Sequence, residues 1–279
     1  MPAMPELPEV ETTVRRFRPR LEGRVIEAFG CRWAPQAQPS VRAVRAGVVG
    51  RQVRRLWRRG KYLVADLAAP GGDDAGCLLI HLRMSGRLEW ADDRVQPLPR
   101  HARSWWDLGG SGRLVLCDAR KFARVWYVRS AGQVVGRLGV EPLERGFTAR
   151  RLGRLLRGRS RQLKPLLLDQ SVVAGLGNIY VDEALFAAGL HPTASSRDLS
   201  DDQVARLHTA IRQVLRRAIR HNGTSFDAVY PEGGMERYLK VYGRAGQQCP
   251  RCRATIERIV VAQRGTHVCP VCQPPPRRK

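Results

Sequence analysis

The sequence predicts an α+β protein built from several domains: a β-rich N-terminal half, a helical half and a small cysteine-bearing module. Short runs of β-branched and aromatic residues, separated by glycine-rich turns, fill residues 51–128. Residues 200–223 instead carry apolar side chains at steps of three and four. Four of the seven cysteines gather near the C-terminus. At about 150 residues per domain, a chain of 279 residues suggests two domains.

The β-rich half is expected to form antiparallel strands with glycine-rich connections. Residues 51–67, 77–90 and 113–128 hold most of its β-branched and aromatic side chains. Residues 70–76, with the sequence PGGDDAG, are typical of a turn.

One early helix is predicted in the stretch LPEVETTVRRF, residues 7–17. Pro8 suits the first turn of a helix, and Glu6 and Glu9 lie near the positive end of its dipole. Pro19 is expected to stop it.

The second half follows a linker at residues 139–147, which combine proline, glycine and charged side chains. Residues 162–170 and 178–189 each predict a helix, and the glycine-containing stretch between them predicts a turn. Two helices joined by a tight glycine turn form a common nucleic-acid-binding unit.

A longer helix is expected to begin at Ser200, which has Gln203 at the spacing of a capping box. Asn222 and Gly223 are expected to end it. Its apolar positions recur at helical spacing: Val204, Leu207, Ile211, Val214, Leu215, Ala218 and Ile219.

The composition is strongly basic. Lys and Arg number 49 against 25 Asp and Glu, a formal net charge of +24. A polyanion is the natural partner, because many cationic contacts release the counterions condensed on phosphates. A high-GC genome would explain the excess of Arg over Lys, but it does not explain the shortage of acids. We therefore favour nucleic acid as the partner.

No early apolar run follows a basic stretch, so no signal peptide is expected. No run reaches about 18 apolar residues, so no membrane span and no membrane partner are expected. The expected location is the cytoplasm.

The C-terminal cysteines form two Cys-x-x-Cys pairs separated by sixteen residues. This spacing predicts one structural zinc ion with four thiolate ligands: Cys249, Cys252, Cys269 and Cys272. The alternative, a redox dithiol, needs only one pair. The other three cysteines (Cys31, Cys77 and Cys117) stand alone in apolar settings and are expected to be reduced core thiols.

The sixteen residues between the pairs predict a β-hairpin with Arg264 and Gly265 at its turn. An arginine there is either a solvated charge or a finger that reaches a phosphate. Asn178 follows two glycines at a predicted helix start, where exposed N–H groups bind phosphate. The alternative is that Asn178 only caps the helix and binds no ligand.

Two apolar residues lie beside predicted turns and next to basic residues: Met84 in HLRMSG and Phe122 in DARKF. One interpretation is core packing. The other is that both side chains wedge into a base stack, where they would fill the space of an extruded base.

The chain starts MPAMPELPEV, with a proline after each of two methionines. A terminal proline is a secondary amine that attacks an aldehyde carbon and forms an iminium ion. Its pKa lies near 8, and a helix N-terminus should lower it further. Only Pro5 is followed by a carboxylate, Glu6, that could shuttle protons. We therefore expect Met4 to be the functional start.

Several motifs together resemble bacterial formamidopyrimidine-DNA glycosylase, from Met4 to about Gln273. They are MPELPEVET, RRGKYL, HLRMSG, DARKF, KPLLLDQ, VAGLGNIYVDEALF, VYGR and the cysteine ribbon with QRGTH. The related endonuclease VIII branch usually lacks the LPEVE form, so the match favours the branch that repairs purine lesions. The order of the motifs is more specific than any one of them.

The resemblance implies a bacterial, nucleoid-associated DNA repair enzyme that excises oxidised purines and then cleaves the abasic strand by β,δ-elimination. It implies double-stranded DNA with oxidised bases or abasic sites as partner, a monomer, and no catalytic metal. The catalytic residues it implies are Pro5 as Schiff-base nucleophile, Glu6 as proton donor with Glu9 in support, and Lys61 and Arg264 in the eliminations. The implied DNA-binding residues are Met84, Arg120 and Phe122 in the void of the flipped nucleotide, with His101, Arg159 and Asn178.

The implied fold is an N-terminal β-sandwich with flanking helices, a helix-two-turn-helix domain and a zinc ribbon, with DNA between the halves. The expected domain limits are 4–141, 147–238 and 239–273, with a disordered tail at 274–279.

The sequence departs from the family pattern at three places. Met1–Ala3 precede the expected start, the segment of residues 222–244 is short, and extra residues follow His101. The short segment leaves the lesion preference open, including an endonuclease VIII-like activity on oxidised pyrimidines. A chain that kept residues before Pro5 would be a catalytically silent DNA-binding protein.

Overall fold

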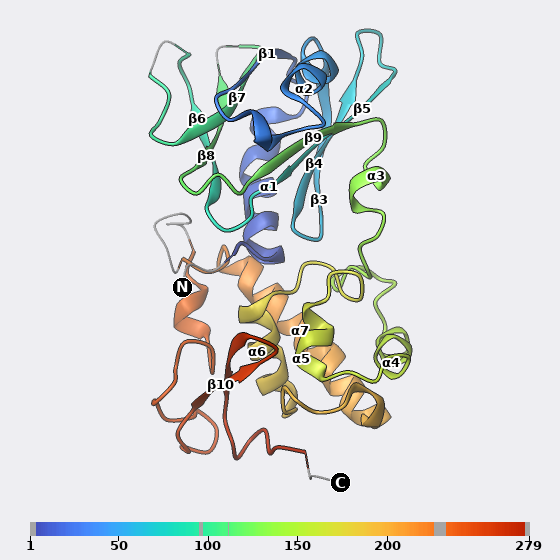
Figure 1. Cartoon of the computed structure of the whole chain (residues 1–279), viewed down its shortest axis with the longest axis vertical. Coiled ribbons are helices and arrows are strands. Elements are labelled where there is room, and N and C mark those ends of the chain that lie inside the picture. Colours follow the sequence, from blue (N-terminus) through green and yellow to red (C-terminus); the bar gives the residue numbers. More distant parts are fainter. Residues whose placement is uncertain (1–3, 95–96, 111, 226–232, 277–279) are drawn as a thin grey trace. The chain divides into compact units, whose positions relative to one another are not determined.

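The computed structural model describes residues 4–94, 97–110, 112–225 and 233–276 (Figure 1). Within it the chain forms two compact units. Glu9–Arg137 make up most of the first unit, while Glu6–Pro8, Leu138–Thr224 and the C-terminal segment belong to the second. The predicted α+β organisation is confirmed, with a sheet-rich first unit and a mainly helical second unit. The domain limits expected from the sequence stay predictions.

The first unit contains two sheets. The four-stranded sheet has the order β1-β7-β8-β6, and all its pairs are antiparallel. The five-stranded sheet has the order β2-β9-β5-β4-β3, in which only the short β2 runs parallel to its neighbour. The strands are β1 (Ile26–Cys31), β2 (Ala37–Gln38), β3 (Gln52–Arg59), β4 (Tyr62–Ala68), β5 (Asp74–His81), β6 (Gly86–Ala91), β7 (Ala102–Leu108), β8 (Arg113–Asp118) and β9 (Arg124–Val128).

One apolar core joins the two sheets of the first unit. It includes Trp106 from the four-stranded sheet and Leu63 from the five-stranded sheet, both almost fully buried. Strand β7 alternates buried and half-exposed residues along its length, as expected for a strand with one face on a core. The predicted β-sandwich is therefore confirmed.

Two helices flank this sandwich: α1 (Leu7–Leu21) and α2 (Val41–Val48). Ser40 caps α2, because its hydroxyl accepts the N–H of Ala43. The first unit also holds a short helix, α3 (Gly132–Val135), and a 3-10 turn, η1 (Ala34–Gln36).

Helix α1 is longer than predicted. Pro19 was expected to stop it, but the helix continues to Leu21 with Pro19 inside its last turn. A proline removes one hydrogen bond near the helix end, and the buried side chains of Phe17 and Leu21 hold that end on the core. Tertiary packing thus outweighs the local stop signal.

The predicted strand regions also shift at their edges. The stretch 51–67 forms the hairpin β3–β4, which turns at Gly60 in the left-handed region (φ 56°), in keeping with the expected antiparallel strands and glycine connections. The predicted turn at 70–76 is shorter, because β5 already begins at Asp74 opposite Ala68.

The second unit is built from helices, as predicted. They are α4 (Ala149–Arg157), α5 (Leu163–Leu168), α6 (Asn178–Ala188) and α7 (Asp201–Arg220), with 3-10 turns η2 (Ser196–Asp198) and η3 (Met235–Tyr238). The capping box at the start of α7 is confirmed: the Ser200 hydroxyl accepts the Gln203 N–H, and the Gln203 side chain accepts the Ser200 N–H. Asn222 and Gly223 follow its end in left-handed conformations (φ 58° and 78°).

The second unit ends in an antiparallel hairpin of β10 (Glu257–Val261) and β11 (Arg264–Val268). The expectation that Arg264 and Gly265 form its turn is wrong. Ala262 and Gln263 form the turn, with φ of 46° and 61°, and Arg264 opens β11 opposite Val261. Two central residues with positive φ give a two-residue turn whose twist matches the strands.

No helix in the described part of the chain is long and apolar enough to cross a membrane. Met1–Ala3, part of the short segment at 222–244, and the last three residues lie outside the described residues.

Candidate nucleic-acid interface and metal centre

The carboxylate of Glu6 lies at the start of α6. Its Oε1 accepts the N–H of Ile179 at 2.9 Å, and its Oε2 accepts the N–H of Tyr180 at 3.4 Å. The side chain is almost fully buried. Negative charge is favourable at this position, because the first N–H groups of a helix lack partners within it. Glu6, which directly follows Pro5, is thus held in one place.

The glycines before α6 make this approach possible. A Cβ atom on Gly177 would lie 2.3 Å from Cδ of Glu6, and one on Gly175 would lie 2.7 Å from Cβ of Leu7. The N–H of Leu7 also donates to the carbonyl of Gly175 at 3.0 Å. The GLG sequence is therefore needed so that the Glu6–Leu7 segment can pack on this turn.

This arrangement changes the expectation for the start of α6. The sequence predicted exposed N–H groups that could bind phosphate, but those of Ile179 and Tyr180 are buried against Glu6. The side chain of Asn178, the first residue of α6, is also bonded within the protein. Its Nδ2 donates to the carbonyl oxygen of Gly265 at 3.1 Å.

A buried ion pair that sequence reasoning missed connects α5, α6 and β11. Nζ of Lys164 lies 2.6 Å from Oδ1 of Asp182, and both side chains are fully buried. Lys164 also donates to the carbonyl of Gly265 and the hydroxyl of Thr266, and Asp182 accepts the N–H of His267. Burial lowers the pKa of Lys164, while the charge of Asp182 opposes that shift.

The ion pair fixes the strand that begins with Arg264. Asn178 and Lys164 donate to the same carbonyl oxygen, that of Gly265, so two helices hold the residue next to Arg264. The structure therefore brings Asn178 and Arg264, two residues predicted from the sequence, to neighbouring positions. Only the fold could reveal Lys164 and Asp182, because nothing in the local pattern marks either as buried and paired.

The wedge candidates lie on two loops of the first unit. Phe122 is 41% exposed, and the Arg120 guanidinium lies 4.8 Å from the centre of its ring. Met84 is half-buried. The exposure of Phe122 disfavours the interpretation that its ring fills the core.

Lys61 lies in the two-residue turn between β3 and β4 and is buried. Near it lies His81, whose pKa is lowered to about 3 by burial and by the charges of Arg83 and Lys61. His81 is therefore neutral at pH 7, and its Nδ1 accepts the N–H of Arg83 at 3.0 Å. A neutral imidazole accepts such a bond, whereas a protonated one cannot.

The remaining two DNA-binding candidates lie in different units. His101 belongs to the first unit, where it adopts a left-handed conformation (φ 66°) just before β7. Arg159 follows α4 in the second unit, and its guanidinium donates to the carbonyl of Leu155.

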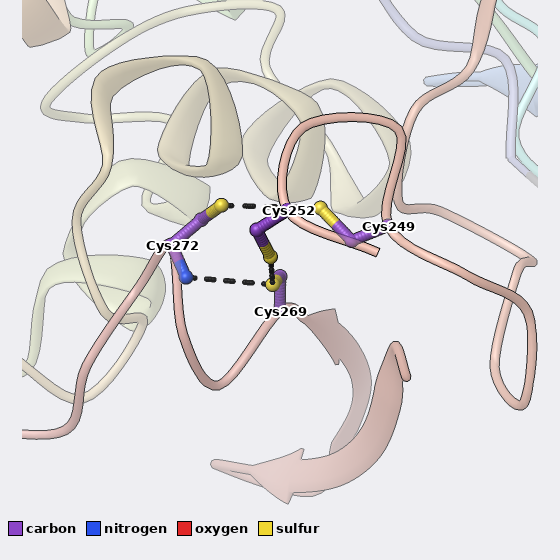
Figure 2. A group of neighbouring side chains, drawn as sticks. All are labelled: Cys249, Cys252, Cys269 and Cys272. Carbon is purple, nitrogen blue, oxygen red and sulfur yellow. Dashed lines mark hydrogen bonds between the residues drawn. The ribbon is translucent and has the colours of Figure 1, made fainter. Parts of the chain in front are cut away.

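The four C-terminal cysteines form a candidate metal site (Figure 2). Their sulfur atoms all lie within 4.8 Å of one another, and Figure 2 shows the four side chains converging from two turns. The Sγ atoms of Cys249 and Cys272 are 3.9 Å apart, and those of Cys252 and Cys269 are 3.5 Å apart. Four sulfurs about 2.3 Å from a tetrahedral zinc ion would be about 3.8 Å apart, so the cluster fits this ion.

Backbone N–H groups support the sulfurs. Arg251 N–H donates to Sγ of Cys249, and Cys272 N–H donates to Sγ of Cys269, each at 3.4 Å. Cys249 and Cys269 also pack with Phe186 of α6 in a small apolar cluster. The centre thus connects the hairpin to the helical part of the same unit.

A methyl group at position 177 should destabilise the protein. Gly177→Ala places its Cβ against Glu6 and should cost about 1–3 kcal/mol, because a buried carboxylate and two N–H groups lose their partners. Urea unfolding measures this cost. Gly153→Ala in α4 is the control, since its nearest neighbour would be at an ordinary 3.5 Å; equal effects of the two changes would contradict the assignment.

Metal removal should loosen the hairpin. Purified protein should contain one zinc ion per chain by emission spectrometry, and Cys252→Ser should lose it, because one ligand is missing. Cys31→Ser, which changes a lone thiol, should keep the ion. Full zinc content in Cys252→Ser, or an unfolding midpoint that a chelator does not change, would disprove the structural site.

Three protein-family models match successive parts of the chain. Residues 4–125 match the formamidopyrimidine-DNA glycosylase N-terminal domain, and residues 138–229 match the H2TH domain of the same glycosylase. Residues 246–275 match a zinc finger found in FPG and IleRS.

Relatives match over nearly the whole chain. The chain is 42% identical to formamidopyrimidine-DNA glycosylase of Chloroflexus aurantiacus, with 97% of this chain and 98% of the relative covered. It is also 42% identical to that of Herpetosiphon aurantiacus, with 97% and 100% covered.

Solved structures agree with these relatives. A complex of Lactococcus lactis Fpg with abasic-site DNA superposes with a TM-score of 0.88 at 35% identity, covering 97% of this chain and 100% of that one. A MutM complex with DNA containing carbocyclic 8-oxo-G gives 0.89 at the same identity and coverage. The chain therefore belongs to the formamidopyrimidine-DNA glycosylase family of DNA repair glycosylases.

Proposed function

We propose that this glycosylase excises oxidised purines from double-stranded DNA through a Schiff base on Pro5 and then cleaves the strand by β,δ-elimination. The observation that carries the proposal is the position of Glu6, which is fixed at the start of α6 directly after Pro5. The related Lactococcus lactis enzyme has been solved with DNA that contains an N7-benzyl-Fapy-dG lesion, which supports a purine substrate.

The chemistry follows from a free proline amine. The Pro5 nitrogen attacks C1′ of the damaged nucleotide, the bond to the base breaks, and the base leaves with a proton. The proline nitrogen then loses its own proton, the C1′–O4′ bond of the sugar ring breaks while O4′ takes up a proton, and an iminium ion forms between C1′ and the nitrogen. The resulting iminium ion acidifies C2′, so that loss of a proton expels the 3′ phosphate and a second elimination expels the 5′ phosphate. Glu6 exchanges protons at the sugar, with Glu9 in support.

Two cations assist the eliminations. Lys61 serves as the proton donor of the first and contacts phosphate, and Arg264 grips phosphate for the second. Arg264 lies at the start of β11, next to Gly265, whose carbonyl is held by Lys164 and Asn178. Its main chain is therefore fixed while its side chain extends to a DNA phosphate.

Flipping a nucleotide out of the duplex costs a few kcal/mol, which other contacts must offset. Met84, Arg120 and Phe122 enter the space that the nucleotide leaves; an exposed ring paired with a guanidinium suits this role. Asn178 binds phosphate, and His101 and Arg159 contact the DNA. Binding to the DNA backbone by these residues is consistent with the high positive charge of the chain.

A single zinc ion, held by the four cysteine thiolates, is structural in this proposal. All four of its positions are filled by sulfur, which leaves none for water or substrate. Its role is to fix the hairpin that carries Arg264.

Substrate choice should separate this proposal from its alternative. Duplexes with 8-oxoguanine or a formamidopyrimidine should be cut to products with a phosphate at both ends of the gap, which denaturing gels resolve. An enzyme that prefers oxidised pyrimidines, such as thymine glycol, would instead be endonuclease VIII-like. Products with an intact abasic strand would disprove the lyase step.

The start of the mature chain should decide whether the enzyme is active. Protein begun at Met4, with that methionine removed, should form a covalent adduct with abasic DNA when borohydride is added. Protein begun at Met1, in which residues remain before Pro5, should bind DNA without an adduct, because the Pro5 nitrogen is then an amide with no free electron pair for attack. Equal trapping of both forms, with Pro2 as the attached residue, would contradict this prediction.

A further inference from the structure

Asp118 occupies a special place in the first unit. It is the last residue of β8, which lies between β7 and β6, and its side chain is fully buried. Its carboxylate accepts three hydrogen bonds from neutral groups. Oδ1 accepts the hydroxyl of Ser85 and, at 3.2 Å, the N–H of Arg120; Oδ2 accepts the N–H of Ala123 at 2.7 Å.

These bonds reach both loops that carry the wedge candidates. Ser85 directly follows Met84, and Arg120 and Ala123 enclose Phe122. The main chain of Asp118 adds a third loop, because its N–H donates to the carbonyl of His101 at 2.9 Å. One residue therefore contacts the three loops of the first unit that carry Met84, His101, and Arg120 with Phe122.

The same three loops hold strained backbone. Arg83, His101 and Lys121 have φ of 55°, 66° and 61°, and they are the three non-glycine residues with positive φ among the described part of 9–137. Such conformations are costly for residues with a Cβ atom and persist only where surrounding contacts hold them. In two of the three loops, the strained residue directly precedes a wedge candidate, Met84 or Phe122.

The contacts of Asp118 explain how the strain is held. An ionised carboxylate has two oxygens with about four acceptor sites, so it satisfies several donors from different loops at once. A buried carboxylate is stable only with such donors, and each donor left without it would be a buried unsatisfied group. The carboxylate and the loops therefore require each other.

We infer that Asp118 is a positioning residue that sets Met84, Arg120 and Phe122 in one arrangement before DNA binds, so that all three enter the base stack together. This inference rests on the proposed function. It assigns Asp118 no contact with the reacting atoms. Ser85 links the two wedge loops, because its hydroxyl donates to the same carboxylate that accepts the N–H groups of Arg120 and Ala123.

A substrate without a stack separates this role from a general loss of stability. A single-stranded abasic oligonucleotide offers no duplex space to fill, so the wedge residues should not affect the covalent step on it. Asp118→Asn and Ser85→Ala should slow excision from an 8-oxoguanine duplex by about tenfold, the effect of about one hydrogen bond. Both should trap the single-stranded substrate within about twofold of the wild-type rate.

Two controls make the test specific. Ser104→Ala removes a buried serine hydroxyl of the same unit that donates to Gln36 rather than Asp118, and it should leave both rates unchanged. In a Phe122→Ala background, Asp118→Asn should have a much smaller effect on the duplex rate, because Asp118 acts by positioning the Phe122 side chain that this background lacks.

Three results would overturn the inference. The first is an equal loss on duplex and single-stranded substrates, which would mean a general structural role. The second is that Asp118→Asn slows the duplex rate as strongly in the Phe122→Ala background as in the wild-type protein. The third is a duplex rate unchanged by both variants. A wild-type protein that traps neither substrate would instead disprove the proposed function, and the inference with it.

Discussion

The anchoring of Glu6 at the start of α6 is the contact on which the proposed chemistry depends. A terminal proline is joined to the chain on one side only, so the residues that follow it must fix its position. Here the next residue is held by two backbone N–H groups of a helix, and the one after it by the carbonyl of Gly175. Charge, helix dipole and the two glycines act together, because the carboxylate reaches the N–H groups only where Gly177 lacks a side chain.

Further along its length, helix α6 also holds other segments through buried carboxylates. Every residue from Ile179 to Phe186 is buried, as expected for a helix surrounded by other elements on all sides. Asp182 pairs with Lys164 and fixes β11. The next residue, Glu183, accepts the N–H groups of three consecutive residues, 240–242, and burial raises its pKa.

Three buried carboxylates thus connect four segments to one helix: the Glu6–Leu7 segment, α5, β11 and residues 240–242. An apolar helix could pack against the same segments, but it would not specify which backbone atoms meet. Removing one partner of a buried ion pair typically costs about 3–5 kcal/mol, because a charge is left without compensation. The polar contacts therefore determine where Asn178 and Arg264 lie, while the apolar contacts supply most of the stability.

Features that depend on neighbours in the chain could be predicted from the sequence. The capping box at Ser200 and the cysteine pairs are examples, since the spacing of a few residues determines both the geometry and the chemistry. The resemblance to a family extended this to the sandwich and to the candidate site residues, whose roles stay predictions.

Features that depend on tertiary contacts could not be predicted. Pro19 lies inside α1 because the core holds the helix end, and the hairpin turn forms at Ala262 and Gln263 although a glycine follows two residues later. The donors to Asp118 and the acceptors of Lys164 come from segments far away in the sequence or from loop backbone that no periodic pattern describes.

The most direct test of the account is to locate the covalent bond. Abasic DNA is trapped with borohydride on protein begun at Met4, the complex is digested with protease and nuclease, and the modified peptide is sequenced by mass spectrometry. We expect the sugar remnant on the nitrogen of Pro5, at the head of the peptide that contains Glu6. A remnant on Lys61 or another lysine, with Pro5 unmodified, would contradict the account.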